Sequence, residues 1–362
     1  MTTRTTSPGI SAVDADESPV SPVSTESPES PRSRMVIKRF TEPWKLWWTA
    51  LNRRHSVNRA VASLERSPTV VAVEGPYRHD HVYVRGVRLH VAVAGSPADP
   101  LVLLLHGAFG GWFDYKDVIA PLAAEGFHVA AVDLRGYGLS DKPPSGYDIR
   151  RSAGDINGVI GALGHDDAVL VGTDTGGSLA WAVSTLYPDR VAGVISLGAV
   201  HPADLRRALR RKPHLFGSVL SRITLFNLPI TLLRTIRFVV PRASRREVVR
   251  DTTPSYQRSN AYSGAIKLRQ KALAIDHTFT PIVRTNRLMA ASLPGRSDHQ
   301  IARCPVWLLT PRDNRTEYLA SLARSRTSGD FRLVSVPGIT PLSFLEDPLS
   351  FTGMIAGFLK DS

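Results

Sequence analysis

Residues 169–177 read Val-Leu-Val-Gly-Thr-Asp-Thr-Gly-Gly. An apolar run ends at Gly172, a Thr-Asp-Thr triplet centred on Asp174 follows, and two glycines open a helical pattern that continues to Tyr187. Small residues around one central side chain are what a sharp strand-to-helix turn requires, because any bulk beside it would clash. The stretch therefore predicts a turn that presents the Asp174 carboxylate as a nucleophile toward carbon, with an alkyl ester as the intermediate.

Short apolar runs alternate with amphipathic helical patterns on both sides of this turn. An alternating pattern over residues 79–95 predicts two antiparallel strands joined at Gly86. Buried strands are expected at residues 101–105, 127–132, 168–172, 191–199, 306–310 and 331–336, and helices at residues 112–124, 150–163, 176–187, 317–325 and 348–359. This order predicts an α/β fold, with a mostly parallel sheet and helices on both of its faces.

The alternation is interrupted between residues 201 and 300, where the sequence is mainly helical and rich in arginine. This segment contains 19 Lys and Arg against 5 Asp and Glu, a surplus of 14, whereas the whole chain has a net charge of +13. We expect residues 201–300 to form a basic helical lid, inserted into a core made of residues 77–200 and 301–362. The basic surface indicates either a solvated helical face or an anionic partner such as lipid head groups.

The N-terminal part divides into two segments. Residues 1–34 consist mostly of Ser, Thr, Pro and scattered charge. They have too little apolar surface to offset chain entropy, which predicts a disordered tail. Residues 35–76 form a basic, Trp-rich helical segment and a linker. The Trp-rich part, residues 35–66, is expected either to pack on the main domain or to lie on an anionic membrane surface.

Cysteine use and hydropathy limit the cellular context. Cys304 is the only cysteine, so an intramolecular disulfide is excluded, as is common in a reducing compartment. Apolar runs stay well below the ~18 residues of a membrane-spanning helix, and the chain does not begin with a signal-peptide pattern. We expect a cytoplasmic protein, with membrane association as the alternative. No nucleic-acid motif or Cys/His zinc cluster is present, so we expect no nucleic acid, no metal and no cofactor.

A glycine-containing loop follows the first parallel strand, one unit before the Asp174 turn. Backbone N–H groups at such a strand end can point toward a developing oxyanion. We expect an oxyanion hole made by His106, Gly107, Ala108 and Thr175. Its stabilising donors are predicted to be the N–H groups of Ala108 and Thr175.

Three motifs occur in a fixed order along the chain: His-Gly-x-x-Gly at residues 106–110, Asp-x-x-Gly-x-Gly-x-Ser-Asp-Lys-Pro at 133–143 and Gly-x-Asp-x-Gly-Gly at 172–177. Together they resemble the epoxide hydrolases and their haloalkane dehalogenase relatives, the aspartate-nucleophile branch of the α/β-hydrolase superfamily. The resemblance covers roughly residues 77–360. It implies the α/β-hydrolase fold, Asp174 in the nucleophile elbow, and a small apolar or amphipathic substrate.

The resemblance also implies a water-activating histidine, an acid that orients it, and two lid tyrosines that polarise the epoxide oxygen. Tyr256 and Tyr262 are the tyrosines of the lid, and ordinary packing is their alternative role. At the histidine position this chain has Pro341, whose side chain cannot accept a proton. The acid position falls on Asn314, with Asp313 beside it as the candidate acid.

One further histidine is a candidate for the missing base. His201 follows the predicted strand 191–199 at the same edge of the sheet as Asp174. Loss of the base from such a unit typically costs several powers of ten in rate. Two hypotheses follow: a hydrolase with Asp174 as nucleophile and weakened turnover, or a catalytically degenerate relative that acts as a binding or scaffold protein, at a membrane surface in one version.

Overall fold

The computed structural model describes residues 67–293, 299–311, 313–335 and 338–360. The chain divides into two units, Met1–Leu64 and Glu65–Ser362, and the described residues all belong to the second. The predicted disordered tail (residues 1–34) and the Trp-rich segment (residues 35–66) lie outside the described residues.

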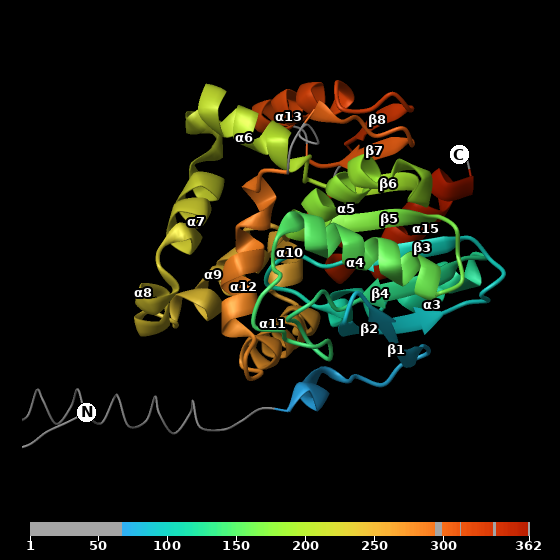
Figure 1. Ribbon diagram of the computed structural model, residues 1–362, viewed down its shortest axis with the longest axis horizontal. Coiled ribbons are helices and arrows are strands. Elements are labelled where there is room, and N and C mark those ends of the chain that lie inside the picture. The colour runs from blue at the N-terminus through green and yellow to red at the C-terminus, as the bar shows by residue number, and fades with distance from the viewer. Residues whose placement is uncertain (1–66, 294–298, 312, 336–337, 361–362) are drawn as a thin grey trace, which may run out of the picture. The chain divides into compact units, whose positions relative to one another are not determined.

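Eight strands form one sheet in the order β1-β2-β4-β3-β5-β6-β7-β8 (Figure 1). Their bounds are β1 (Arg78–Val84), β2 (Val87–Ala94), β3 (Leu101–Leu105), β4 (His128–Val132), β5 (Ala168–Thr173), β6 (Val191–Leu197), β7 (Val306–Leu309) and β8 (Phe331–Val334). β2 pairs antiparallel with both β1 and β4, and the remaining pairs are parallel. The predicted mostly parallel sheet is confirmed. The turn between β1 and β2 has positive φ at Arg85 and Gly86, as two-residue hairpin turns require.

Helices cover both faces of the sheet. The helices outside the lid are α3 (Ile119–Ala124), α4 (Ile149–Ala162), α5 (Asp174–Leu186), α13 (Asn314–Arg324), α14 (Ser343–Glu346) and α15 (Pro348–Lys360), with short 3-10 turns η1 (Pro68–Val71), η2 (Trp112–Tyr115) and η3 (Pro188–Arg190). α4 and α5 contribute to one apolar cluster, and α3 and α15 contribute to the other. The two clusters lie on opposite faces because neighbouring residues of a strand point to opposite sides.

One predicted helix is wrong in its extent. The expected helix over residues 112–124 is divided into η2 and the shorter α3. Pro121 explains the break, because proline is tolerated only in the first turn of a helix, where its missing N–H has no partner to lose. A helix that began at Trp112 would place Pro121 in its interior.

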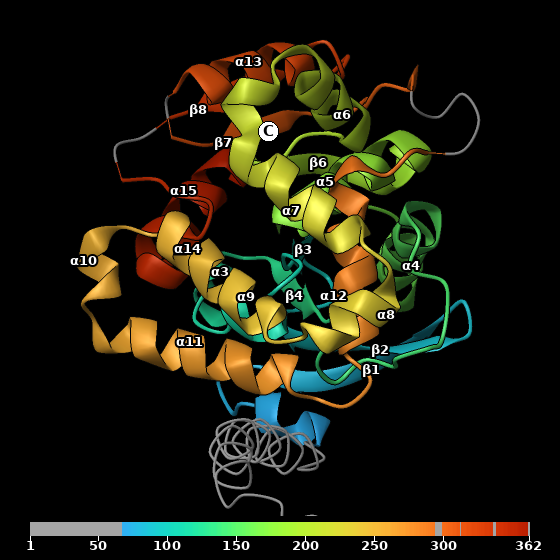
Figure 2. The same ribbon diagram turned by 90° about the vertical axis from the view of Figure 1, so that its left-hand side faces the viewer.

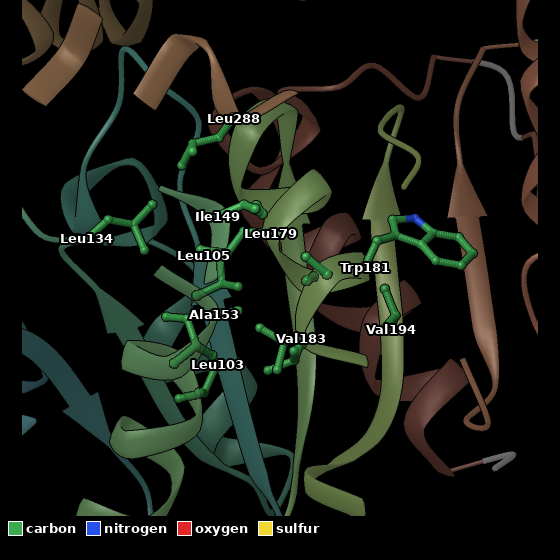
Figure 3. Close-up of a cluster of buried hydrophobic side chains, with 14 of the residues drawn as sticks. Leu103, Leu105, Leu134, Ile149, Ala153, Leu179, Trp181, Val183, Val194 and Leu288 are labelled. Carbon is green, nitrogen blue, oxygen red and sulfur yellow. The ribbon is translucent and has the colours of Figure 1, made fainter. Parts of the chain in front are cut away.

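The inner strands β3, β5, β6 and β7 are largely buried on both sides, which is why their sequences are mostly apolar. In β3, Leu103 and Leu105 belong to one cluster and Val102 and Leu104 to the other. Figure 3 shows the first cluster, in which Leu103 and Leu105 lie close to side chains of α4 and α5. Leu288, at the end of the lid segment, belongs to the same cluster. Apolar packing therefore fastens the end of the lid segment to the core.

The segment between β6 and β7 is helical, as predicted. Its helices are α6 (Pro202–Arg211), α7 (Gly217–Asn227), α8 (Ile230–Thr235), α9 (Val239–Arg250), α10 (Pro254–Gln257), α11 (Asn260–Leu273) and α12 (Phe279–Asn286), with 3-10 turns η4 (Pro213–Phe216) and η5 (Leu288–Ala290). We call α6 to α12 the lid helices. Figure 2 shows α7, α9 and α12 in front of the sheet. Among the described residues, no helix combines the length and the apolar character needed to cross a membrane.

Candidate active site

The turn between β5 and α5 holds Asp174 at a φ of 51°. This is the left-handed region, where a residue with a side chain is strained. A Cβ added at Gly172 would lie 2.6 Å from the carbonyl carbon of Gly176, and one added at Gly176 would lie 2.3 Å from the carbonyl oxygen of Leu105. Only glycine fits at these two positions. The sharp turn predicted from the sequence is therefore confirmed, and it places Asp174 directly after β5.

The Asp174 carboxylate is held by one lid arginine and by backbone N–H groups. Arg222, in α7, donates from its two amino groups to the two carboxylate oxygens at 2.8 Å each. The N–H of Ala108 donates to Oδ2 at 3.1 Å. Burial alone raises the pKa of Asp174, but the charge and hydrogen bonds of Arg222, with the N–H groups of Ala108 and Thr175, outweigh burial and lower it to about 2. Asp174 is therefore ionised at neutral pH.

Gly107 and His106, two residues of the predicted oxyanion hole, occupy different places around Asp174. Gly107 lines a cavity beside Asp174, and a Cβ added to it would lie 3.0 Å from the Asp174 Cβ. The His106 Nε2 accepts the N–H of Leu134 at 3.1 Å, and its Nδ1 lies 2.7 Å from the Gly107 carbonyl oxygen. Burial lowers the pKa of His106. Both nitrogens of its neutral imidazole therefore contact backbone groups, at Gly107 and Leu134, and stabilise the loop.

Arg222 connects Asp174 to a chain of buried charges. Its Nη1 lies 3.6 Å from Oε1 of Glu247, in α9. The Glu247 Oε2 accepts from Arg269, in α11, at 2.8 Å, and Arg269 donates to the two carboxylate oxygens of Asp114 at 3.0 and 2.8 Å. The side chains of Glu247, Arg269 and Asp114 are at most 5% exposed. We call these five residues the buried ion chain.

Within the buried ion chain, Glu247 is the carboxyl group whose pKa lies near neutral pH. Burial and the neighbouring Asp174 charge raise its pKa to about 7, although Arg269 and Arg222 oppose the shift. Its Oε1 is buried and accepts no hydrogen bond from any group in the described residues. The buried ion chain contains two guanidinium groups and three carboxyl groups, so one proton makes it neutral. The raised pKa of Glu247 makes it the carboxyl group that takes up this proton most readily.

A cavity of about 80 Å³ lies against the elbow. Its walls include Asp174 and Thr173 from the core, Arg222 and Glu247 from the lid helices, and Pro341 from the loop after β8. The Thr173 hydroxyl donates to the Pro341 carbonyl oxygen at 2.9 Å. The position predicted to lack a histidine therefore faces the same cavity as Asp174. Histidine is absent from the walls that the described residues form.

Two further candidates from the sequence act as helix caps. The His201 Nδ1 accepts the N–H of Ala203 at 3.2 Å at the start of α6. Burial and nearby arginines lower the pKa of His201 to about 3. The Asp313 carboxylate accepts the N–H of Thr316 at 2.6 Å at the start of α13. Neither side chain is among the described residues that line the cavity.

The lid tyrosines pack against each other. The rings of Tyr256 and Tyr262 meet edge to face, with centroids 6.1 Å apart. Burial raises the pKa of Tyr256 to about 12. Both residues lie outside the set of described residues that form the cavity walls. Their contribution to catalysis stays a prediction, and the packing that the sequence offered as the alternative is present.

No group of three or more His, Cys, Asp or Glu side chains in the described ranges could hold a metal ion. The groups that line the cavity include an ionised carboxylate, a second carboxyl with a pKa of about 7, and guanidinium groups.

The sequence reasoning missed the lid half of this site, namely Arg222, Glu247 and Arg269. One signal was present: Glu247 is the only glutamate among residues 201–300. A single carboxylate in an arginine-rich helical segment is a candidate for a buried ion pair, because unpaired charges are rarely buried. Nothing in the spacing of the sequence indicates which arginines it meets.

Comparison with known proteins supports the fold. Residues 100–278 match the family model described as the alpha/beta hydrolase fold. The chain is 43% identical over 124 residues to epoxide hydrolase B of Mycobacterium tuberculosis, covering 33% of this chain and 35% of that protein. It is 33% identical over 168 residues to epoxide hydrolase 4 of Mus musculus, covering 44% of this chain and 46% of that protein. The matches thus span less than half of the length of these curated relatives.

The similarity to solved structures extends further along the chain. The crystal structure of epoxide hydrolase A from Mycobacterium thermoresistibile matches with a TM-score of 0.57 and 25% sequence identity, covering 78% of this chain and 98% of that one. The sheet order, the turn at Asp174 and the family match agree with one another. The chain has the α/β-hydrolase fold, and it is similar in sequence and structure to the epoxide hydrolases.

Proposed function

We propose that this protein is a hydrolase that cleaves a carbon–oxygen or carbon–halogen bond, with Asp174 as its nucleophile. The observation that carries the proposal is the ionised Asp174 carboxylate, held in a strained turn and facing a small cavity. Such a carboxylate attacks an electrophilic carbon and forms an alkyl ester. The similarity to epoxide hydrolases supports epoxides as the substrate class. Alkyl halides present the same kind of electrophilic carbon and are included in the proposal on that chemical ground.

The backbone donors around Asp174 have a role in the second half of this reaction. In the ester, the N–H groups of Ala108 and Thr175 remain directed at the oxygens of the modified side chain. Water that attacks the ester carbonyl carbon creates an oxyanion there. Donors that are already in place stabilise this charge without reorganisation, which typically contributes a few kcal/mol per donor.

Arg222 holds the carboxylate before the substrate enters. A bidentate ion pair draws electron density away from the oxygens and lowers their nucleophilicity. We propose that substrate binding displaces Arg222 from one oxygen. Arg222 keeps other partners when this happens, because its Nε donates to Asn286 at 2.6 Å and its Nη1 lies 3.6 Å from Glu247.

The test is the intact mass of the protein after incubation with small terminal epoxides and primary alkyl bromides. The wild type is expected to gain the mass of one epoxide, or the mass of one alkyl bromide less hydrogen bromide, and Asp174→Asn is expected to gain nothing. Peptide mapping of the wild type locates the adduct independently of how well the variant folds. A panel that yields neither adduct nor product would contradict the proposal.

A binding or scaffold role without turnover is the second candidate, and one observation favours it. Pro341 stands in the cavity wall where a water-activating histidine is expected, and Arg222 occupies both oxygens of Asp174. A stable adduct that is never released, or no reaction at all, supports this role. Sustained release of diol or alcohol would rule it out.

The membrane version of this second role has support from the lid surface. Leu232 and Phe238 are 47% and 54% exposed, and Arg242 lies over the Phe238 ring at 4.8 Å. Apolar side chains beside arginines suit an anionic lipid surface. Flotation with liposomes that contain phosphatidylserine, compared with neutral liposomes, tests this role for the full chain and for Phe238→Ser. Equal flotation of both proteins with both lipids would contradict it.

A further inference from the structure

We propose that Glu247 is the proton-transfer residue of this site, acting as the base that activates water in place of the absent histidine and as the acid that protonates the oxygen of an opening epoxide. The proposal rests on the proposed role of Asp174 as nucleophile. In this proposal a lid residue activates the water molecule, a role that the resemblance implies for a histidine of the core.

The position of Glu247 is the first argument. Glu247 and Asp174 line the same cavity, and the Arg222 guanidinium touches both carboxyl groups. The Glu247 Oε1 is buried and has no hydrogen-bond donor or acceptor partner in the described part of the chain. The Arg222 Nη1 lies 3.6 Å from this oxygen, which is too far for a hydrogen bond. A buried carboxyl oxygen without a hydrogen bond is costly. A water molecule or a substrate oxygen in the cavity would satisfy it.

The orientation of Glu247 is the second argument. Its other oxygen, Oε2, accepts from Arg269 at 2.8 Å, and Arg269 is held in turn by both oxygens of Asp114. The Arg269 and Asp114 side chains are each 2% exposed. A base must be held within reach of the proton that it takes. Arg269 and Asp114 thus orient Glu247 as a second acid orients a catalytic histidine.

The surrounding charges give Glu247 a suitable proton affinity. The charged groups that face it from other helices are Asp174 of α5, Arg222 of α7 and Arg269 of α11. Arg250, at the end of the same helix, and Asp251, the next residue, form an ion pair close to it. Burial and the Asp174 charge raise its pKa to about 7. A group with a pKa near the working pH is the most effective general acid or base.

Alkylation of Asp174 lowers the pKa of Glu247, which favours the ionised form that acts as a base. The ester carries no charge, so the repulsion that Asp174 exerts on ionised Glu247 disappears, and Arg222 loses one of its anionic partners. Both changes lower the pKa of Glu247. The carboxylate form that a base requires is therefore favoured once the intermediate has formed.

The proton balance closes over both steps with an epoxide. Asp174 attacks the ring carbon, the ring C–O bond breaks, and protonated Glu247 gives its proton to the departing oxygen. Glu247, now ionised, takes a proton from water as the hydroxide adds to the ester carbonyl carbon. Collapse of the intermediate breaks the ester C–O bond, and the proton of the resulting Asp174 acid passes to the alkoxide, which leaves as the diol. Glu247 is again protonated and Asp174 is again ionised.

The test separates the two steps by using two substrate classes with Glu247→Gln. An alkyl bromide needs no acid in the first step, because bromide leaves as an anion. We expect Glu247→Gln to form the bromide-derived ester within about twofold of the wild-type rate and to lose it at least about 100-fold more slowly. With an epoxide, the variant is expected to form the ester more slowly as well. Asp330→Asn, a surface carboxyl paired with Arg332, is the control and is expected to match the wild type.

The pH dependence gives a readout that a purely structural role would not produce. Loss of the ester by the wild type is expected to slow as pH falls through the pKa of Glu247, whereas the slow loss in Glu247→Gln is expected to show no such inflection. Loss of the ester at the wild-type rate in Glu247→Gln would overturn the proposal and leave Asp174 as nucleophile. A folded variant that fails to react with the bromide would also overturn it, because Glu247 would then support the site only structurally. If neither protein forms an adduct or product, the nucleophile proposal itself fails.

Discussion

The two walls of the cavity are built in different ways. The core wall comes from short, local pieces of backbone: the turn at Asp174 and the loop at Ala108, each directly after a parallel strand. The lid wall comes from Arg222, Glu247 and Arg269, which lie on three separate helices and are joined by ion pairs. The core wall is therefore fixed by the sheet, whereas the lid wall depends on compensation among buried charges.

The two carboxyl groups that face each other across this boundary have opposite pKa shifts. Asp174, held by Arg222 and backbone N–H groups, has its pKa lowered to about 2. Glu247, beside the Asp174 charge, has its pKa raised to about 7. Neighbouring titratable groups whose pKa values are pushed apart are typical of acid–base sites. This difference in pKa supports the proposal that Asp174 of the core is the nucleophile and Glu247 of the lid is the proton-transfer residue.

The largest effect is expected from removing the nucleophile. Asp174→Asn should lower product formation by at least about 10⁴-fold, since loss of a covalent nucleophile typically disables the whole catalytic unit. Glu247→Gln should lower it by about 10²–10³-fold. Initial rates with one epoxide measure both. A larger loss for Glu247→Gln than for Asp174→Asn would reverse the assignment of the two walls.

The next effect concerns stability. Arg269→Met leaves the buried Asp114 carboxylate without its cation and removes one of the two cations beside Glu247. It is expected to destabilise the fold by about 3–5 kcal/mol. Arg332→Gln breaks an exposed pair with Asp330 and is expected to cost less than about 1 kcal/mol. Denaturant unfolding of both variants measures the difference. Equal losses would show that the buried ion chain is no more important to stability than a surface pair.

A smaller effect is expected in the pH dependence of stability. The folded pKa of Glu247 is about 7 against an ordinary value of 4.5. The folded state therefore binds the proton more tightly than the unfolded state, and the contribution of Glu247 to stability falls by about 3 kcal/mol as pH rises through that window. Asp174 has the opposite sign, because its pKa falls from 3.8 to about 2 and its contribution is lost as pH drops through that range. Glu247→Gln should remove the first slope and retain the second. If the free energy of unfolding has the same slope between pH 4.5 and 7 in Glu247→Gln as in the wild type, the raised pKa of Glu247 is contradicted.

The smallest effect is expected from restoring a histidine to the core wall. In the Glu247→Gln background, Pro341→His places an imidazole at the cavity and is expected to speed loss of the ester by about tenfold, a modest gain for general base catalysis. The gain is limited because Asp313 caps α13 and is therefore already engaged. Adding Asn314→Asp tests whether an orienting acid raises the rate further. No gain in either variant would show that position 341 does not reach the ester.

The core was predictable because its signals are local. Apolar runs gave β3 and β5 nearly to the residue, and the glycines around Asp174 indicated the turn that the backbone adopts. The expected helix over 112–124 is longer than the observed α3, because Pro121 is tolerated only in the first turn of a helix. The resemblance also places Pro341 at the position of the expected histidine, and this substitution can be read from the sequence alone.

The lid wall was not predictable for a physical reason. Arg222, Glu247 and Arg269 are separated by more than twenty residues at each step and meet only through tertiary packing. An arginine-rich segment offers many possible partners for one glutamate, and sequence spacing does not select among them. The desolvation that shifts the Glu247 pKa exists only in the folded state.

The most direct test of the nucleophile is a single turnover of an epoxide in ¹⁸O-labelled water with enzyme in excess. An Asp174 ester that is hydrolysed at its carbonyl carbon places ¹⁸O in the Asp174 carboxylate and leaves the first diol unlabelled. Mass spectrometry of the diol and of the peptide that contains Asp174 reads both products. We predict label on Asp174 and none in the diol; label in the diol with none on Asp174 would contradict the covalent role of the elbow carboxylate.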